Sequence, residues 1–174
     1  MTIYYLQVVR LLVSVIENTF SIFYSDCAPG WTFSYHTKRC YKLIFGTQLW
    51  NNWNHARAYC NYIAPYNGDL VSVHDLKTIE ELYKLVQSEG FKNDFYFWIG
   101  GYREMNGSMW LWSDRSVYSY NRWRPDNADP EKNRLTLFRN SAIFDEKDIS
   151  FHAWFQPEKA NTLLGFICEY QGIK

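Results

Sequence analysis

Four cysteines place the strongest constraint on what this chain can fold into. Cys27, Cys40, Cys60 and Cys168 stand at wide and unequal spacings in a chain of 174 residues. They form no C-x-x-C pair and have no nearby histidine to complete a zinc site, so disulfides are the better interpretation. Of the three pairings that four cysteines allow, we predict Cys27–Cys40 inside a hairpin and Cys60–Cys168 as a staple that joins the two ends. In the chain-entropy model the long staple contributes about 4 to 5 kcal/mol and the short loop about 3 kcal/mol.

The composition fits one globular domain and argues against a nucleic acid or a membrane surface as a partner. Aromatic residues make up 20% of the chain, which supplies ample apolar area for a core. Lys and Arg together number 18, as do Asp and Glu, and no run of like charge exceeds two residues. Such a chain sets up no field that would hold a nucleic acid or an anionic membrane surface. We therefore predict neither as a partner.

Residues 1–25 have some features of a signal peptide, but Arg10 and Glu17 interrupt their apolar run. The uninterrupted apolar stretch "LLVSVI" is too short for a good signal core or a membrane span. A degenerate signal peptide and an amphipathic N-terminal helix both stay open for this segment. The prediction of a secreted, extracellular protein without a membrane span therefore rests mainly on the disulfides, which persist in oxidising compartments.

Apolar periodicity predicts two helices, one starting after Asn52 and one starting after Asp75 and ending at Gly90. Asn and Asp are good helix N-caps, and Gly ends helices readily. The predicted core faces are Trp53, Ala56 and Cys60 in the first helix and Ile79, Leu82 and Val86 in the second.

Strands are predicted between and after these helices. They cover a hairpin over residues 30–44, a buried strand over 68–73, two strands over 95–101 and 109–113, and a final strand over 164–170. The step Asn106-Gly107 is a tight-turn dipeptide, and "NGS" makes Asn106 a candidate N-glycosylation site in a glycosylating secretory pathway. Residues from about 115 to 162 are expected to form a long irregular segment.

These residues, taken in order, resemble a known family. The pattern consists of Trp53, Ala56 and Cys60, then "GDLVSV", "WIGG" at 98–101, "WLWSD" at 110–114, Trp123 and the terminal "FICEY". It resembles the C-type lectin-like domain over residues 26–171, and "CAPGW" resembles the long form of that domain. The resemblance implies an α+β fold in which two helices flank antiparallel sheets, a disulfide staples the ends, and a long loop region binds ligands.

The loop region departs from the pattern of sugar-binding members. The second disulfide of the family is missing, because its positions fall near Leu135 and near Lys159 or Ala160. The positions that hold calcium and sugar in such members read Asn127-Ala128-Asp129, Asn133 and Trp154-Phe155-Gln156. Ala128 removes the proline whose cis bond would aim the flanking carbonyls, and Phe155 and Gln156 remove an amide and a carboxylate.

Charge counting also argues against calcium. Residues 115–165 hold seven acidic and eight basic side chains, whereas a calcium cage needs a local surplus of carboxylates. We therefore predict no metal and no cofactor, and we retain Asn127, Asp129, Asn133 and Trp154 as candidate ligand-binding residues. "QPE" at 156–158 looks like a sugar triplet, but it stands at the wrong place in the order.

Catalysis is not predicted. The histidines are His36, His55, His74 and His152, and they lie far apart without metal-helix spacing. Ser108 lacks the second glycine of a nucleophile elbow, and no glycine-rich phosphate loop follows a strand. Four tryptophans could stack on sugars but are better interpreted as core framework: Trp98, Trp110, Trp112 and Trp123.

Three functions follow, in order of preference. The first is a secreted recognition module that binds a glycan or protein through the loop region without calcium. The second is a calcium-dependent lectin that uses Asn127, Asp129 and Asn133 with a displaced acid such as Glu131 or Asp145. The third is a structural or matrix domain without a specific ligand.

Overall fold

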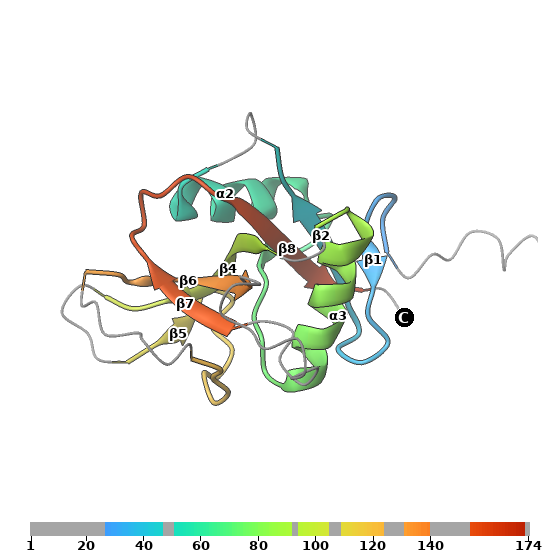
Figure 1. The fold of residues 1–174 in the computed structure, drawn as a ribbon. Coiled ribbons are helices and arrows are strands. Elements are labelled where there is room, and N and C mark those ends of the chain that lie inside the picture. Colours follow the sequence, from blue (N-terminus) through green and yellow to red (C-terminus); the bar gives the residue numbers. More distant parts are fainter. Residues whose placement is uncertain are drawn as a thin grey trace, which may run out of the picture.

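The computed structural model describes residues 27–46, 51–91, 94–104, 109–123, 131–139 and 154–172. Within these ranges the chain forms two helices and eight strands (Figure 1). The elements are β1 (Thr32–Phe33), β2 (Arg39–Ile44), α2 (Trp53–Ile63), β3 (Asp69–Leu70), α3 (Leu76–Ser88), β4 (Phe95–Tyr102), β5 (Leu111–Trp112), β6 (Arg134–Arg139), β7 (Trp154–Glu158) and β8 (Gly165–Gln171).

Both predicted helices are confirmed, together with the residues that cap them. The side-chain oxygen of Asn52 accepts a hydrogen bond from the backbone N–H of His55 at 3.0 Å. Asp75 accepts one from the backbone N–H of Thr78 at 2.8 Å. Each bond satisfies an otherwise unpaired donor of a first helical turn. The six core-face residues predicted for α2 and α3 are all buried.

The eight described strands form one sheet in the order β1-β2-β8-β4-β6-β7, with β3 paired to β8 and β5 to β4. All neighbouring pairs are antiparallel except β4 and β8, which run parallel. The prediction of antiparallel sheets is therefore right for all but one pairing. Because β8 pairs with β4, the final strand lies in the middle of the sheet, between β2 and β4.

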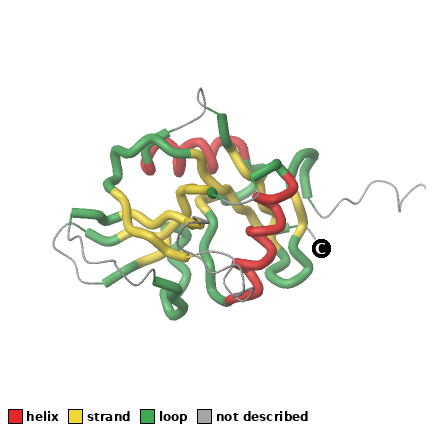
Figure 2. The backbone as a smooth tube through the Cα atoms, in the orientation of Figure 1, coloured by secondary structure: helices red, strands yellow, loops and turns green. Residues whose placement is uncertain are grey.

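The two helices cover opposite faces of this sheet (Figures 1 and 2). Successive side chains of a strand point to opposite faces. Phe97 and Ile99 of β4 belong to the core cluster that contains α3, whereas Trp98 belongs to the cluster that contains α2. In β8, Ile167 packs on the α3 side and Phe166 on the α2 side. Two cores thus share one sheet.

Both predicted disulfides are confirmed. Cys27 is bonded to Cys40 and Cys60 to Cys168, and the described residues contain no free cysteine. The long staple ties α2 to β8 across a sequence separation of 108. The beginning and end of the described domain also meet, because the Ala28 backbone N–H donates to the Tyr170 hydroxyl at 2.6 Å.

Two strand predictions were wrong in extent. Over residues 68–73 only Asp69 and Leu70 pair with a strand, although Val71 and Val73 are fully buried. The region 115–162, expected to be irregular, contains β6 and β7, which pair with each other and extend the sheet. The run "RLTLFR" is short and bracketed by arginines, so its strand character depends on the neighbouring β4, against which Leu135 and Leu137 become completely buried.

Close packing explains the "WIGG" motif of β4. A Cβ atom added at Gly101 would lie 2.2 Å from Cδ1 of Leu135, and one at Gly100 would lie 2.8 Å from the carbonyl oxygen of Leu70. Glycine is therefore needed where β4 passes its neighbours.

Candidate functional site

The predicted loop site begins where Trp123 meets β7. Trp123 forms a bridge with Phe155, and the backbone N–H of Phe155 donates to the carbonyl of Arg122 at 2.7 Å. Phe155 is completely buried and packs edge-on against Trp112, Tyr120 and Trp123. The position that would carry an amide ligand in a calcium lectin is thus part of the core.

The predicted framework role is confirmed for the tryptophans around this point. Trp98 and Trp112 are buried, and Trp110 and Trp123 are partly buried against the core cluster that contains Trp112. The rings of Trp110 and Trp123 lie 5.2 Å apart, and the guanidinium of Arg103 lies over Trp110 at 5.1 Å. Their packing leaves less ring surface for a ligand.

Asn133, a candidate ligand residue, stands directly before β6 and is largely buried. Its carbonyl accepts hydrogen bonds from the Arg103 backbone N–H at 3.0 Å and from Nη1 of Arg134 at 2.9 Å. Burial lowers the pKa of Arg134, while nearby Glu104 and Tyr102 oppose that shift. The backbone at Asn133 is therefore held firmly between two arginines.

Two of the described acids at this end of the sheet face lysines. Glu131 accepts from Nζ of Lys159 at 2.7 Å, and Glu158 lies 3.5 Å from Nζ of Lys132. Glu158 also accepts from the Tyr96 hydroxyl at 3.2 Å. Carboxylates that are already paired with ammonium groups are poor starting points for a calcium shell.

The two described candidate residues, Asn133 and Trp154, lie apart on the sheet. In the β6–β7 register Trp154 lies opposite Phe138, whereas the neighbour of Asn133, Arg134, lies opposite Glu158. Five residues of strand separate Asn133 from Phe138, which corresponds to about 16 Å along the sheet. Asn106, Asn127 and Asp129 lie outside the described residues.

The part of the chain that the structure describes contains no cluster suited to a metal ion. No three His, Cys, Asp or Glu side chains come close enough there to hold an ion. The same residues contain no cis peptide bond, and Gln156-Pro157-Glu158 forms part of β7. That triplet is therefore a strand segment. This agrees with the sequence analysis, which did not accept it as a sugar-binding triplet because of its position in the chain.

A second polar region, which sequence reasoning did not single out, lies beside the long staple. At its centre Glu169 of β8 is completely buried. Its Oε1 accepts from Nη1 of Arg39 at 2.7 Å and from the backbone N–H and hydroxyl of Ser72 at 3.1 and 2.9 Å. The Ser72 hydroxyl also reaches Asp114 at 2.9 Å. A charged residue inside the apolar strand "FICEY" was the signal that could have revealed this region.

Burial controls the titration of this second region. Desolvation raises the pKa of Glu169 to about 7, although Arg39 acts in the opposite direction. The pKa of Asp114 is lowered, because hydrogen bonds from Ser116 and Ser72 and the charge of Arg39 outweigh its desolvation. Desolvation also lowers the pKa of His74. Oε1 of Glu169 and the carboxylate of Asp114 are hydrogen-bonded within the fold, whereas Oε2 of Glu169 is buried without a hydrogen-bond partner among the described residues. The region is a buried network that braces β2, β8 and the turn after β5.

The fold and the arrangement of the loop region define the class of protein. The order of strands, the two helices and the staple are those of the C-type lectin fold. A solved structure of a mutant of the lectin CEL-I aligns with a TM-score of 0.68 at 18% identity, covering 84% of this chain and 97% of that one. Human lithostathine aligns with a TM-score of 0.65 at 22% identity, covering 84% and 91% of the two chains.

Sequence comparison establishes the family. The model of the lectin C-type domain matches residues 50–170. The galactose-specific lectin nattectin of Thalassophryne nattereri is 31% identical over 127 residues, covering 68% of this chain and 74% of the relative. A C-type lectin mannose-binding isoform of Oxyuranus scutellatus is 32% identical over 133 residues, covering 75% of each. The chain belongs to the C-type lectin domain family.

Proposed function

We propose that this chain is an extracellular recognition module that binds a glycan or protein ligand through residues 115–162, without calcium. The observation that carries the calcium-independent part is the pairing of Glu131 and Glu158 at this end of the sheet with lysines. The proposed activity is binding, with no catalytic step.

The argument against calcium is electrostatic. A calcium ion takes six to eight oxygen ligands, and carboxylates supply most of the attraction. The ammonium of Lys159 already lies 2.7 Å from Glu131. Each such cation would repel a divalent ion by about 1 kcal/mol or more, even in a polar surrounding. The buried Phe155 removes a further ligand position.

The relatives support a glycan as the first ligand class to test. They include a galactose-specific lectin and a mannose-binding C-type lectin isoform. The fold itself also occurs in a solved protein described as a calcium-independent type II antifreeze protein, which aligns with a TM-score of 0.65 at 19% identity. A calcium site is therefore not a requirement of the architecture.

Thermal melting in millimolar calcium and again in chelator tests the proposal. We expect the same Tm in both, whereas calcium at a hundred times its Kd would add about 2.7 kcal/mol to the stability of a calcium-binding protein. A glycan array probed with and without chelator should give the same pattern. A calcium-dependent rise in Tm that disappears in Asp129→Ala would overturn the proposal and favour a calcium-dependent lectin.

The extracellular location is part of the proposal and rests on the two disulfides. In the part of the chain that the structure describes, no helix is long and apolar enough to span a membrane. We further propose that Asn106 carries an N-glycan when the protein is secreted from glycosylating cells. Glycosidase treatment should lower the mass of the wild type and leave Asn106→Gln unchanged, and an unchanged wild-type mass would contradict this assignment.

A further inference from the structure

A polar cleft of about 520 Å³ lies beside the Cys60–Cys168 staple. The residues that line it come from α2, the α2–β3 connection, β3 and the turn after β5. The side chains relevant to its chemistry are Arg57, Asn61, Asn67, Asp69, Asp114 and Arg115. Its walls include none of the candidate residues of the predicted loop site.

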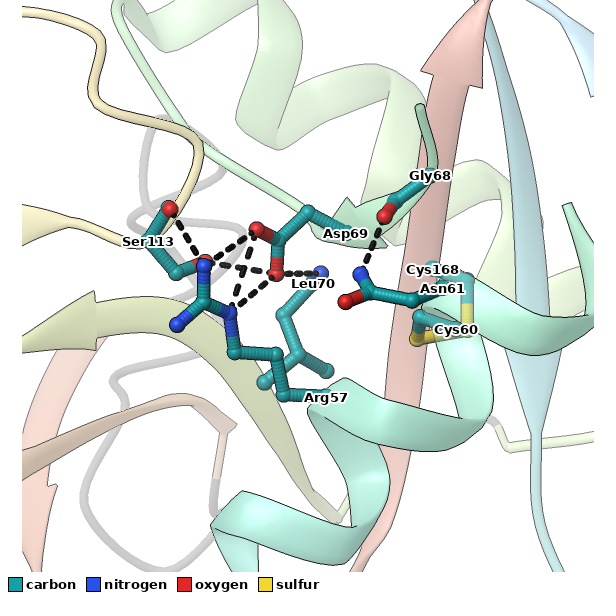
Figure 3. The surroundings of a disulfide bond; sticks show 8 residues. All are labelled: Arg57, Cys60, Asn61, Gly68, Asp69, Leu70, Ser113 and Cys168. Carbon is teal, nitrogen blue, oxygen red and sulfur yellow. Dashed lines mark hydrogen bonds and ion pairs between the residues drawn. A yellow bond between two sulfur atoms is a disulfide. The ribbon is translucent and has the colours of Figure 1, made fainter. Parts of the chain in front are cut away.

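The acids of this cleft are already satisfied within the fold. Asp69 accepts from Nε and Nη2 of Arg57, both at 3.0 Å, and from the Ser113 hydroxyl at 2.8 Å (Figure 3). Asp114 accepts from the backbone N–H of Ser116 at 2.9 Å and lies 3.4 Å from Arg39. Neither carboxylate therefore leaves the cleft strongly anionic.

Arg115 differs from the other charged groups of the cleft. It is exposed, and within the described residues the structure records no ion pair for it. Its φ of +67° lies in the left-handed region, which costs a non-glycine residue roughly 1–2 kcal/mol. A long cationic side chain is thus retained at a position that glycine would occupy with less strain.

Asn67, on another wall of the cleft, also has a positive φ. Its φ is +39°, and its side chain is also exposed. Next to it, Asn61 donates through Nδ2 to the carbonyl of Gly68, which leaves its Oδ1 as an acceptor (Figure 3). The cleft therefore presents one uncompensated guanidinium and two amide groups with free hydrogen-bonding capacity.

We propose that this cleft is a second ligand-binding site, for a saccharide unit that carries a carboxylate. The planar guanidinium of Arg115 matches a carboxylate through two parallel hydrogen bonds. The amides of Asn67 and Asn61 both match sugar hydroxyls, which donate and accept hydrogen bonds. The volume falls within the usual range of small-ligand sites, and this recognition requires no metal.

The backbone geometry provides variants that separate binding from folding. Arg115→Gly and Asn67→Gly remove the ligand-facing groups at positions where glycine is conformationally favoured. Lys38→Gly is the matched control, because Lys38 is also a cationic residue with positive φ, at 59°, but it lies in the β1–β2 turn. All three variants should fold with a Tm close to that of the wild type.

Binding is measured in chelator by NMR titration of the full chain with sialyllactose and with a glucuronate-terminated oligosaccharide, each against its neutral counterpart. We expect at least one acidic probe to bind more tightly than its counterpart and to shift amide signals of residues 61–70 and 113–116. Arg115→Gly should weaken that binding about tenfold or more, Asn67→Gly should weaken it less, and Lys38→Gly should leave it unchanged.

Three results of the affinity measurements would overturn the proposal. They are no binding of either acidic probe at millimolar concentration, equal binding of acidic and neutral probes, and unchanged affinity in Arg115→Gly. Shifts confined to Glu131–Asn133 and Glu158 would instead assign the ligand to the loop site and would also overturn it. Because none of the candidate loop-site residues Asn127, Asp129, Asn133 and Trp154 lines this cleft, failure of one proposal leaves the other testable.

Discussion

The polar network beside the staple and the ion pairs at the loop end show two different uses of charge in one domain. In the network, the Glu169 side chain is 1% exposed and is held by Arg39 and Ser72. At the loop end, the partners Glu131 and Lys159 are 71% and 50% exposed. Buried charges need fixed partners, because a lost partner leaves an uncompensated charge in a medium of low dielectric constant. Exposed pairs exchange readily with water and contribute little to stability.

This difference indicates which surface can change its side chains without loss of stability. The network ties β2, β8 and the turn after β5 into one unit, so most substitutions there should disturb the fold. At the loop end, changes in charge alter what can bind without unfolding the domain. The cleft lined by Arg115 lies next to the network but presents exposed side chains, and it therefore combines a rigid wall with an adaptable surface.

The largest expected effect comes from removing the staple beside the network. The double variant Cys60→Ala/Cys168→Ala should lose about 4 to 5 kcal/mol of unfolding free energy, because the staple closes a sequence separation of 108. Cys27→Ala/Cys40→Ala should lose about 3 kcal/mol for a separation of 13. Urea denaturation measures both losses, and a larger loss for the short loop would contradict this ranking.

A somewhat smaller effect concerns the pH dependence of the network. The pKa of Glu169 is raised from 4.5 to about 7, so the folded state binds more protons than the unfolded state between these values. The contribution of Glu169 to stability is therefore complete below pH 4.5 and declines as the pH rises to about 7, by roughly 3 kcal/mol.

Glu169→Gln isolates this contribution. The lowered pKa of His74 has the opposite effect, because it adds stability as the pH rises from the folded pKa towards 6.5. The histidine is present in both proteins. The unfolding free energy of the wild type relative to Glu169→Gln should therefore fall between pH 4.5 and 7. A constant difference over that range would show that Glu169 is ionised throughout.

The smallest effect is expected at the loop end. Lys159→Ala removes the partner of Glu131 from an exposed position and should change the unfolding free energy by less than about 1 kcal/mol. High salt should reduce even that difference, because exposed pairs are screened. A loss above 2 kcal/mol would show that this pair is structural and would remove the contrast between the two regions.

Much of the fold could be predicted from local sequence. Asn52 and Asp75 marked the helix starts correctly because an N-cap bond forms within one turn. The limits of β3, β6 and β7 could not be predicted in the same way, because strand pairing depends on neighbours far away in the chain. The predicted disulfides were recovered for a different reason, since few pairings of four cysteines exist.

The candidate ligand-binding residues remain predictions, and only part of their surroundings could be predicted from the sequence. The departures at Ala128, Phe155 and Gln156 were visible in the sequence, and the burial of Phe155 agrees with their interpretation. The lysine partners of Glu131 and Glu158 were not visible, because each pair joins residues on different strands or turns. The cleft around Arg115 was missed because no local pattern reports a positive φ at an arginine.

By itself, the sequence determined the two helices, the cysteine pairing, the framework tryptophans and the membership of the chain in a recognisable family. These features depend on short-range periodicity, caps and a small number of covalent alternatives. Only the tertiary structure decided that Glu169 is buried against Arg39 and that Arg115 and Asn67 line one cleft. The physical reason is that burial and charge pairing are properties of groups brought together from distant parts of the chain, and the free energy of each group depends on neighbours that local sequence does not specify.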